Sequence, residues 1–546
     1  MTTETTDALG GGATAAGASS AGPRSGAAAP GRHLAQAAVR DEPVAVRSAR
    51  AGSVEDPAVA ADAPDPRRWL VLAVLALTQL MIVLDATIVS IALPQIQTRF
   101  AISDSNRQWI VTAYGLAFGG LLLLGGRVAD FWGRKRSLIL GVLGFAVASA
   151  IGGLAVNAGM LYGARTLQGV FAALLAPAVL SVLSTTFTDP RERASAFALY
   201  GAIGAGGAAL GLVLGGVLTE YLDWRWCLLV NLPLSALAAL GAIRWVRASR
   251  VQGHARYDIP GAVLVSAGLA GLVYGFTRAS QPGNGWSTAP TIAVLAVSVA
   301  LLVGFVGWES RSSHALMPLR IPRNPVRAGA LLASLVIAAG FIGSTLFLTF
   351  YFQVVEGYSP VRAGLASLPL SGAIALSATV ASKAMQRVAP RWLAVGGALV
   401  SALGLLVTAR LDVGGSFLTA ILPGQIILGL GLGFVFVPLS LTALHEVAPA
   451  DSGVTSALLN ATNQIGGSLG TALLNTIATS ATAAAVSSAV LAGRGADAGP
   501  AALVTGYQHA FTWAAVLLVV AAVVAGLLVR VPRDPALDAR PAAPLG

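Results

Sequence analysis

One acidic residue stands inside an apolar stretch of the sequence, Asp85 in the run from Leu84 to Pro94. A charged side chain costs about 2.5–3.5 kcal/mol at the centre of a membrane helix, so such residues are rare and usually functional. Burial disfavours the charged form, so this carboxyl could take up and release a proton. The alternative is a carboxylate that only pairs with a neighbouring helix.

Arg165 is the one basic residue well inside an apolar stretch, and Gln168 and Gly169 follow it on the same face of a helix. An arginine does not release its proton in a protein, so it would hold an anionic group or stabilise a carboxylate. A structural clamp between helices explains the residue equally well.

A third candidate is the loop sequence GGRVADFWGRKR, which starts at Gly125. Gly133 permits a tight turn, and Asp130 has basic residues on both sides along the chain. We expect a conformational latch here, meaning a charged contact that forms in one state and breaks in another. An ordinary positively charged loop is the alternative. The latch residues are Gly126, Arg127, Asp130, Gly133, Arg134 and Lys135.

A further segment contains Gly207, Gly211 and Gly215 at intervals of four, followed by Gly216. Glycines at this spacing form a ridge on one helix face, which allows a second helix to approach closely.

Composition indicates the environment of these residues. The chain has 546 residues, of which 55% are hydrophobic and only 11% are charged, whereas soluble domains have about 25% charged residues. A soluble fold and a disordered chain are both excluded, which leaves a polytopic membrane protein.

The net charge of +11 comes from basic residues in short loops, so we expect no nucleic-acid partner. The single cysteine, Cys227, excludes an intramolecular disulfide.

The sequence between the tails divides into apolar runs of the length that crosses a bilayer as a helix. The predicted spans are 69–93, 108–129, 137–156, 160–187, 194–219, 225–247, 259–277, 290–309, 328–354, 362–386, 392–410, 417–443, 452–480 and 509–530. The fold class is therefore an all-α polytopic membrane protein with fourteen transmembrane helices.

The loops predict the orientation of these helices. Sixteen Lys and Arg residues lie in loops on the side of the N-terminal tail, against seven on the opposite side. By the positive-inside rule both termini are cytoplasmic. Residues 1–66 are rich in Ala, Gly, Pro and Ser and are predicted to be a disordered cytoplasmic tail, and 531–546 form a second cytoplasmic tail.

An internal repeat divides the membrane part into halves. An offset of 261 residues aligns Pro177 with Pro438 and Gly163 with Gly424. We interpret 67–250 and 328–530 as two six-helix halves, with two inserted helices and their loops in 251–327. In secondary transporters such repeats place a binding site between two rocking halves.

These motifs resemble those of the major facilitator superfamily, and in particular its fourteen-helix drug–proton antiporter branch. The Asp85 run resembles the element LDxTIVxxALP, the loop resembles GxLADxxGRKR, and the sequence from Arg165 to Gly169 resembles RxxQG. The similarity extends from about residue 69 to 530. One element departs from the family pattern, because Leu212 stands in the glycine ridge where the antiporters usually have proline.

The resemblance implies a proton-coupled antiporter that exports amphipathic antibiotics or other toxic small molecules by alternating access. In that interpretation Asp85 takes the proton, Arg165 tunes it, and Asp130 with Arg134 forms the latch. The energy source is the proton gradient and no cofactor or metal is expected, since the sequence has no GxxxxGK[ST] phosphate-binding loop. The expected partners are a small-molecule drug, protons and the lipid bilayer, around a monomer in the bacterial cell membrane.

Polar and aromatic residues inside spans are candidates for a substrate cavity. They are Gln168, Asn231, Phe350, Gln353, Gln425 and Asn463. Two other functions stay open: a proton-coupled uptake transporter or passive facilitator, and a membrane sensor or enzyme without transport. We do not expect an enzyme, because the five histidines form no HExxH motif and no nucleophile elbow is evident.

Overall fold

The computed structural model describes residues 66–187, 189–248, 258–281, 284–312, 315–317, 319–447, 452–493 and 498–530. Except for Pro66, both predicted tails lie outside these ranges. Within them the regular structure is helical throughout, and fourteen helical stretches are long and apolar enough to cross a membrane. The predicted all-α polytopic fold is confirmed.

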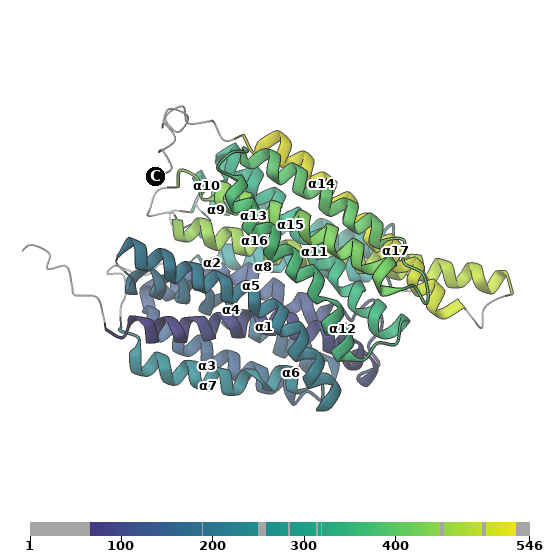
Figure 1. Ribbon diagram of the computed structural model, residues 1–546, viewed down its shortest axis with the longest axis horizontal. Coiled ribbons are helices and arrows are strands. Elements are labelled where there is room, and N and C mark those ends of the chain that lie inside the picture. Colours follow the sequence, from purple (N-terminus) through teal and green to yellow (C-terminus); the bar gives the residue numbers. More distant parts are fainter. Residues whose placement is uncertain are drawn as a thin grey trace, which may run out of the picture. The chain divides into compact units, whose positions relative to one another are not determined.

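The first six spans pack together into one bundle (Figure 1). Helix α4 lies against α2 and α3, while α1 lies against α5 and α7. The sixth span consists of a short α6 followed directly by α7. The helices are α1 (Arg68–Arg99), α2 (Trp109–Trp132), α3 (Arg134–Gly153), α4 (Ala158–Thr186), α5 (Pro190–Tyr221), α6 (Trp226–Leu229) and α7 (Asn231–Trp245).

The next two spans form a helical pair, α8 (Ile259–Ala279) and α9 (Ala289–Glu309), followed by the short α10 (Arg320–Arg323). Helices α8 and α9 pack on each other, and α8 also contacts α2 and α16. The pair therefore touches helices from both parts of the repeat.

The last six spans form the second bundle. Helix α15 packs against α13 and α14, and α11 packs against α16 and α17. A π-helical turn ends the first of these spans and another begins the fourth. The elements are α11 (Pro325–Phe350), η1 (Tyr351–Val355), α12 (Pro360–Ala366), α13 (Leu368–Ala384), α14 (Pro390–Thr408), η2 (Phe417–Ile421), α15 (Leu422–Ala443), α16 (Ser452–Leu491) and α17 (Ala498–Leu528).

The last two helices are longer than predicted. The sequence analysis ended one span at 480 and began the next at 509, whereas α16 continues to Leu491 and α17 begins at Ala498. Hydropathy missed these extensions because they are rich in Ala, Ser and Thr. Alanine is the strongest helix former, and Ser487 and Ser488 satisfy their hydroxyls on carbonyls four residues earlier.

The glycine ridge of α5 lies against two partners. Gly207, Gly211 and Gly215 face α1, where a Cβ on Gly215 would lie 2.8 Å from the carbonyl oxygen of Ile88. Gly216 faces the other bundle instead, and its Cβ would lie 2.6 Å from the carbonyl oxygen of Pro360 in α12. The ridge therefore brings α5 close to α1 and, at its last glycine, to the second bundle.

We expect Gly215→Leu to lower the stability of the folded protein by about 1–3 kcal/mol, because the new side chain would overlap the α1 backbone. The matched control is Gly206→Leu in the same helix, where an added Cβ meets no atom within 4 Å. Thermal unfolding of the purified variants measures the difference. Equal unfolding temperatures for the two variants would contradict close α1–α5 packing at this glycine.

Candidate functional site

Asp85 is completely buried in α1 and accepts hydrogen bonds from three side chains. Arg165 donates to Oδ2 at 2.5 Å, while Gln168 and Asn231 donate to Oδ1 at 2.8 and 2.7 Å. The three donors come from α4 and α7. Because an ionised carboxylate only accepts, this arrangement fits a charged Asp85 paired with a cation.

Arg165 is held from several sides and is only 1% exposed. Its Nε donates to the carbonyl oxygen of Ile110 at 2.9 Å, and its Nη1 also donates to Gln168 Oε1 at 2.9 Å. The guanidinium lies 4.5 Å from the ring centre of Tyr114, a cation–π distance. Arg165 thus has favourable neighbours other than Asp85, all of them neutral.

The network extends through five helices. Gln168 also donates to Ser149 Oγ in α3 at 2.7 Å, and α2 contributes Tyr114 and the carbonyl of Ile110. The Oδ1 atom of Asn231 is buried without a hydrogen-bond partner. The site therefore couples the positions of α1, α2, α3, α4 and α7 to the charge on one carboxylate.

The predicted latch residues lie at the end of α2 and the start of α3. Gly133 has φ = 115°, a conformation that favours glycine and permits the sharp turn between the two helices. Asp130 and Arg134 form an ion pair at 3.7 Å. Lys135 donates to the carbonyl oxygen of Ile243 in α7 at 2.7 Å.

Two further members of this loop contact other segments. Arg127 donates to the carbonyl oxygen of Ala315 at 3.3 Å, which lies beyond the inserted helix pair. A Cβ on Gly126 would lie at ordinary contact distance, 3.5 Å, from Pro177 in α4. The loop thus touches α4, α7 and the segment that follows α9.

The predicted cavity residues separate into two sets. Gln168 and Asn231 belong to the Asp85 network. The others lie on the second bundle, where Phe350 stacks under Arg107 at 4.0 Å and Gln353 donates to the carbonyl oxygen of Ile91 at 2.9 Å. Gln425 is 1% exposed and neither of its amide atoms has a partner, and Asn463 Oδ1 is likewise buried without one. A common substrate cavity for these residues stays a prediction.

A set of polar contacts joins the two bundles at the end where α1 finishes, and we call it the interbundle contact. Arg107 donates to Asn475 Oδ1 at 3.3 Å, and Asn475 donates to the carbonyl oxygen of Asp104 at 2.7 Å. The backbone N–H of Val361 donates to Glu220 at 2.9 Å. Together with the Gln353 bond, these contacts hold the two bundles together at this end.

Sequence reasoning missed several of these participants. Tyr114 and Ser149 lie within apolar stretches of α2 and α3, and their side chains meet Arg165 and Gln168 only after folding. From the sequence, Arg107 is one of the seven basic residues predicted in loops on the side opposite the N-terminal tail. In the structure its side chain is 2% exposed and contacts the second bundle. Among the described residues, no group of three or more His, Cys, Asp and Glu side chains could hold a metal ion.

The fold and the site define a polytopic helical membrane protein with two six-span bundles, the first of which contains a buried ion-pair network. Residues 75–471 match the family profile described as Major Facilitator Superfamily. The chain belongs to this family and is a membrane transporter rather than an enzyme.

Relatives with known names cover most of the chain. The puromycin resistance protein pur8 of Streptomyces alboniger is 46% identical over 477 residues, which is 86% of this chain and 93% of that protein. The cephamycin export protein CmcT of Amycolatopsis lactamdurans is 35% identical over 82% of this chain and 90% of its own length. The multidrug efflux pump LfrA of Mycolicibacterium smegmatis is 35% identical over 76% and 81%.

Solved structures share the fold. The POT family transporter PepTSo matches with a TM-score of 0.62 at 17% identity, covering 85% of this chain and 97% of that one. A bacterial homologue of the human lysosomal transporter Spinster matches with a TM-score of 0.60 at 17% identity and the same coverage.

We expect Arg165→Met to destabilise the protein by about 3–5 kcal/mol, because it leaves Asp85 buried without its cation. Adding Asp85→Asn should recover part of that loss, because the uncompensated charge is then removed. The control is Arg68→Met, which breaks a partly exposed pair with Glu192 and should cost about 0–1 kcal/mol. Unfolding titrations of the wild type and the three variants measure these differences. Equal losses for the two single arginine variants would contradict the importance of the buried pair.

Proposed function

We propose that the protein exports amphipathic antibiotics or related toxic small molecules in exchange for protons. The observation that carries this proposal is the buried network around Asp85, in a chain that is 46% identical over most of its length to a puromycin resistance protein. The relatives include resistance or export proteins for cephamycin, lincomycin and tetracenomycin C. Because these names cover chemically different antibiotics, we propose a substrate class rather than one compound.

In this proposal Asp85 binds the incoming proton. Protonation removes the charge that holds Arg165, so their bond weakens, while Arg165 keeps the Ile110 carbonyl, Gln168 and the Tyr114 ring as neutral partners. Asp85 and its donors lie on three helices, α1, α4 and α7. A change in its charge therefore alters the packing inside the first bundle.

We further propose that both termini are cytoplasmic, as the distribution of Lys and Arg between the loops predicts. The interbundle contact then lies on the external side, and the arrangement described above is closed to the outside. Opening to the outside would break this contact. At the other end we propose Asp130 and Arg134 as part of the latch for the outward-open state; their own ion pair is already formed in this arrangement, so the change between states would lie in what the loop contacts.

The proton gradient supplies enough energy for such an exchange without a cofactor. Moving one charge through 100 mV yields about 2.3 kcal/mol, which corresponds to a roughly fiftyfold concentration ratio of substrate.

Everted membrane vesicles test the direction and the coupling. We expect the wild type to accumulate the antibiotic and to lose that accumulation when a protonophore is added. Asp85→Asn should abolish the protonophore-sensitive part, a loss of up to about fiftyfold, because an amide cannot carry the proton. The control Asp189→Asn replaces an exposed helix cap by another residue that caps well. Accumulation that a protonophore does not affect, or an Asp85→Asn variant with unchanged pH dependence, would overturn the proposal.

A disulfide across the interbundle contact tests alternating access. In Glu220→Cys/Val361→Cys, oxidation should join the bundles and stop transport, and a reductant should restore it, because opening at this end requires the two residues to separate. The single native cysteine, Cys227, is buried and offers little competing reaction. Each single-cysteine variant is the control and should transport under both conditions. A cross-linked double variant that still transports at the wild-type rate would rule out this movement.

A further inference from the structure

The inserted helix pair carries two buried acidic residues that the mechanism above does not use. Asp258 precedes α8 and caps its first turn, and Glu309 is the last residue of α9; they are 4% and 3% exposed. An oxygen of each lies within 3 Å of the position that a Cβ on Gly261 would occupy, at 2.7 and 2.9 Å. The two carboxyl groups therefore share one small site.

The partners of this carboxyl pair are neutral donors. Asp258 Oδ1 accepts from the N–H of Gly261 at 2.9 Å and from Trp308 Nε1 at 2.7 Å, whereas Oδ2 meets no donor. Glu309 accepts from the backbone N–H groups of Leu316 and Met317 at 3.2 and 3.0 Å. Ionised carboxylates only accept hydrogen bonds, so the unpartnered Asp258 Oδ2 can gain a partner on Glu309 only when one of the two groups carries a proton. Two adjacent carboxylates also resist simultaneous ionisation.

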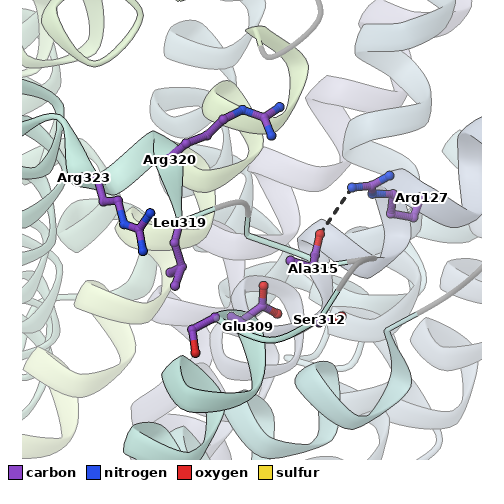
Figure 2. A pocket seen from close by; sticks show the side chains of 8 residues that line it. Arg127, Glu309, Ser312, Ala315, Leu319, Arg320 and Arg323 are labelled. Carbon is purple, nitrogen blue, oxygen red and sulfur yellow. Dashed lines mark hydrogen bonds between the residues drawn. The ribbon is translucent and has the colours of Figure 1, made fainter.

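Three arginines line the same cavity as Glu309, and its volume is about 340 Å³. Figure 2 shows Glu309 and the two arginines of α10, with the Arg320 side chain directed away from Glu309, and it shows Arg127 bonded to Ala315. These cations favour one negative charge beside them. A carboxyl pair that holds a single proton has that charge.

The carboxyl pair is connected to the loop after α2. Glu309 binds the backbone of Leu316 and Met317, and the preceding residue, Ala315, accepts the hydrogen bond from Arg127. Through this path the position of Glu309 affects Arg127, which lies three residues before Asp130, the acidic residue of the predicted latch.

We propose that Asp258 and Glu309 bind one proton between them, as a second proton site separate from Asp85, and that this proton holds Ala315 in contact with Arg127. When the pH rises and the proton leaves, the two carboxylates repel each other and Glu309 moves toward the arginines. The backbone of Leu316 and Met317 moves with it, which releases Arg127 from Ala315. This inference goes beyond the proposed export function, because it assigns a pH-dependent role to the inserted helices whatever the substrate.

Infrared difference spectroscopy on the purified full-length protein tests the proton site. As the pH rises, the wild type should lose a C=O band of a protonated carboxyl group. Asp258→Asn and Glu309→Gln should each remove this band, since an amide N–H of the same shape then replaces the proton. The control Asp189→Asn, at the exposed cap of α5, should keep it. A band that persists in both carboxyl variants would overturn the proposal, as would one that depends on added sodium or potassium, which would assign a metal cation instead.

A spin label on Arg311→Cys tests the connection to the loop, since residue 311 is exposed and the native Cys227 is buried. The label should become more mobile as the pH rises, and Glu309→Gln should remove this pH dependence, because the amide can donate to Asp258 at any pH. A label whose mobility does not change with pH in the otherwise native chain would overturn the loop movement. Neither measurement involves transport, so a failure here is distinguishable from a failure of the proposed export.

Discussion

The ion pair between Asp85 and Arg165 is the contact on which the first bundle depends most. Neither charge is tolerable in hydrocarbon alone, so the two helices that carry them must pack closely enough for a direct hydrogen bond. The neighbouring contact between α4 and α2, which surrounds the guanidinium, requires a small residue. A Cβ on Gly169 would lie 2.8 Å from the side chain of Ala117 and 3.0 Å from the backbone nitrogen of Phe118, so this glycine brings α4 against α2. Close packing there also places Tyr114 and the Ile110 carbonyl around the guanidinium.

The same pair explains how a single proton could change the structure. A buried arginine that loses its anion normally becomes very unfavourable, which would make the protonated state inaccessible. Here Arg165 keeps a carbonyl, an amide oxygen and an aromatic face after Asp85 is neutralised. In the proposed exchange, the donors on α4 and α7 would find new positions when Asp85 takes up the proton.

Much of the fold could be predicted from the sequence, and part of the site. Apolar run lengths predict the fourteen spans because lipid requires every backbone polar group to be satisfied within a helix. Asp85 and Arg165 stand out as exceptions to that apolar pattern. The donor Asn231 was predicted only as a possible cavity residue, because it is 146 positions from Asp85 and their contact depends on how α1 and α7 pack. Arg107 resembles any other loop arginine until the second bundle covers it. Glu309 was overlooked for a similar reason, since a carboxylate at a span end is usually solvated, and here it is buried against Asp258.

Comparison of the two buried acidic sites shows why they would respond to different events. Asp85 faces a cation and two amide donors, so its charged form is satisfied in the arrangement described, and a proton must compete with Arg165. Asp258 and Glu309 lie next to each other and accept hydrogen bonds only from neutral N–H groups. A shared proton would therefore stabilise this site, whereas at Asp85 it would weaken the contacts already present. The first site lies among the helices of a bundle, where a change of charge alters helix packing. The second lies at the ends of α8 and α9, where the same change acts on a short segment and on Arg127. A transporter with both acidic sites would bind one proton at Asp85 as part of the exchange. It would bind a second proton independently, at the ends of α8 and α9.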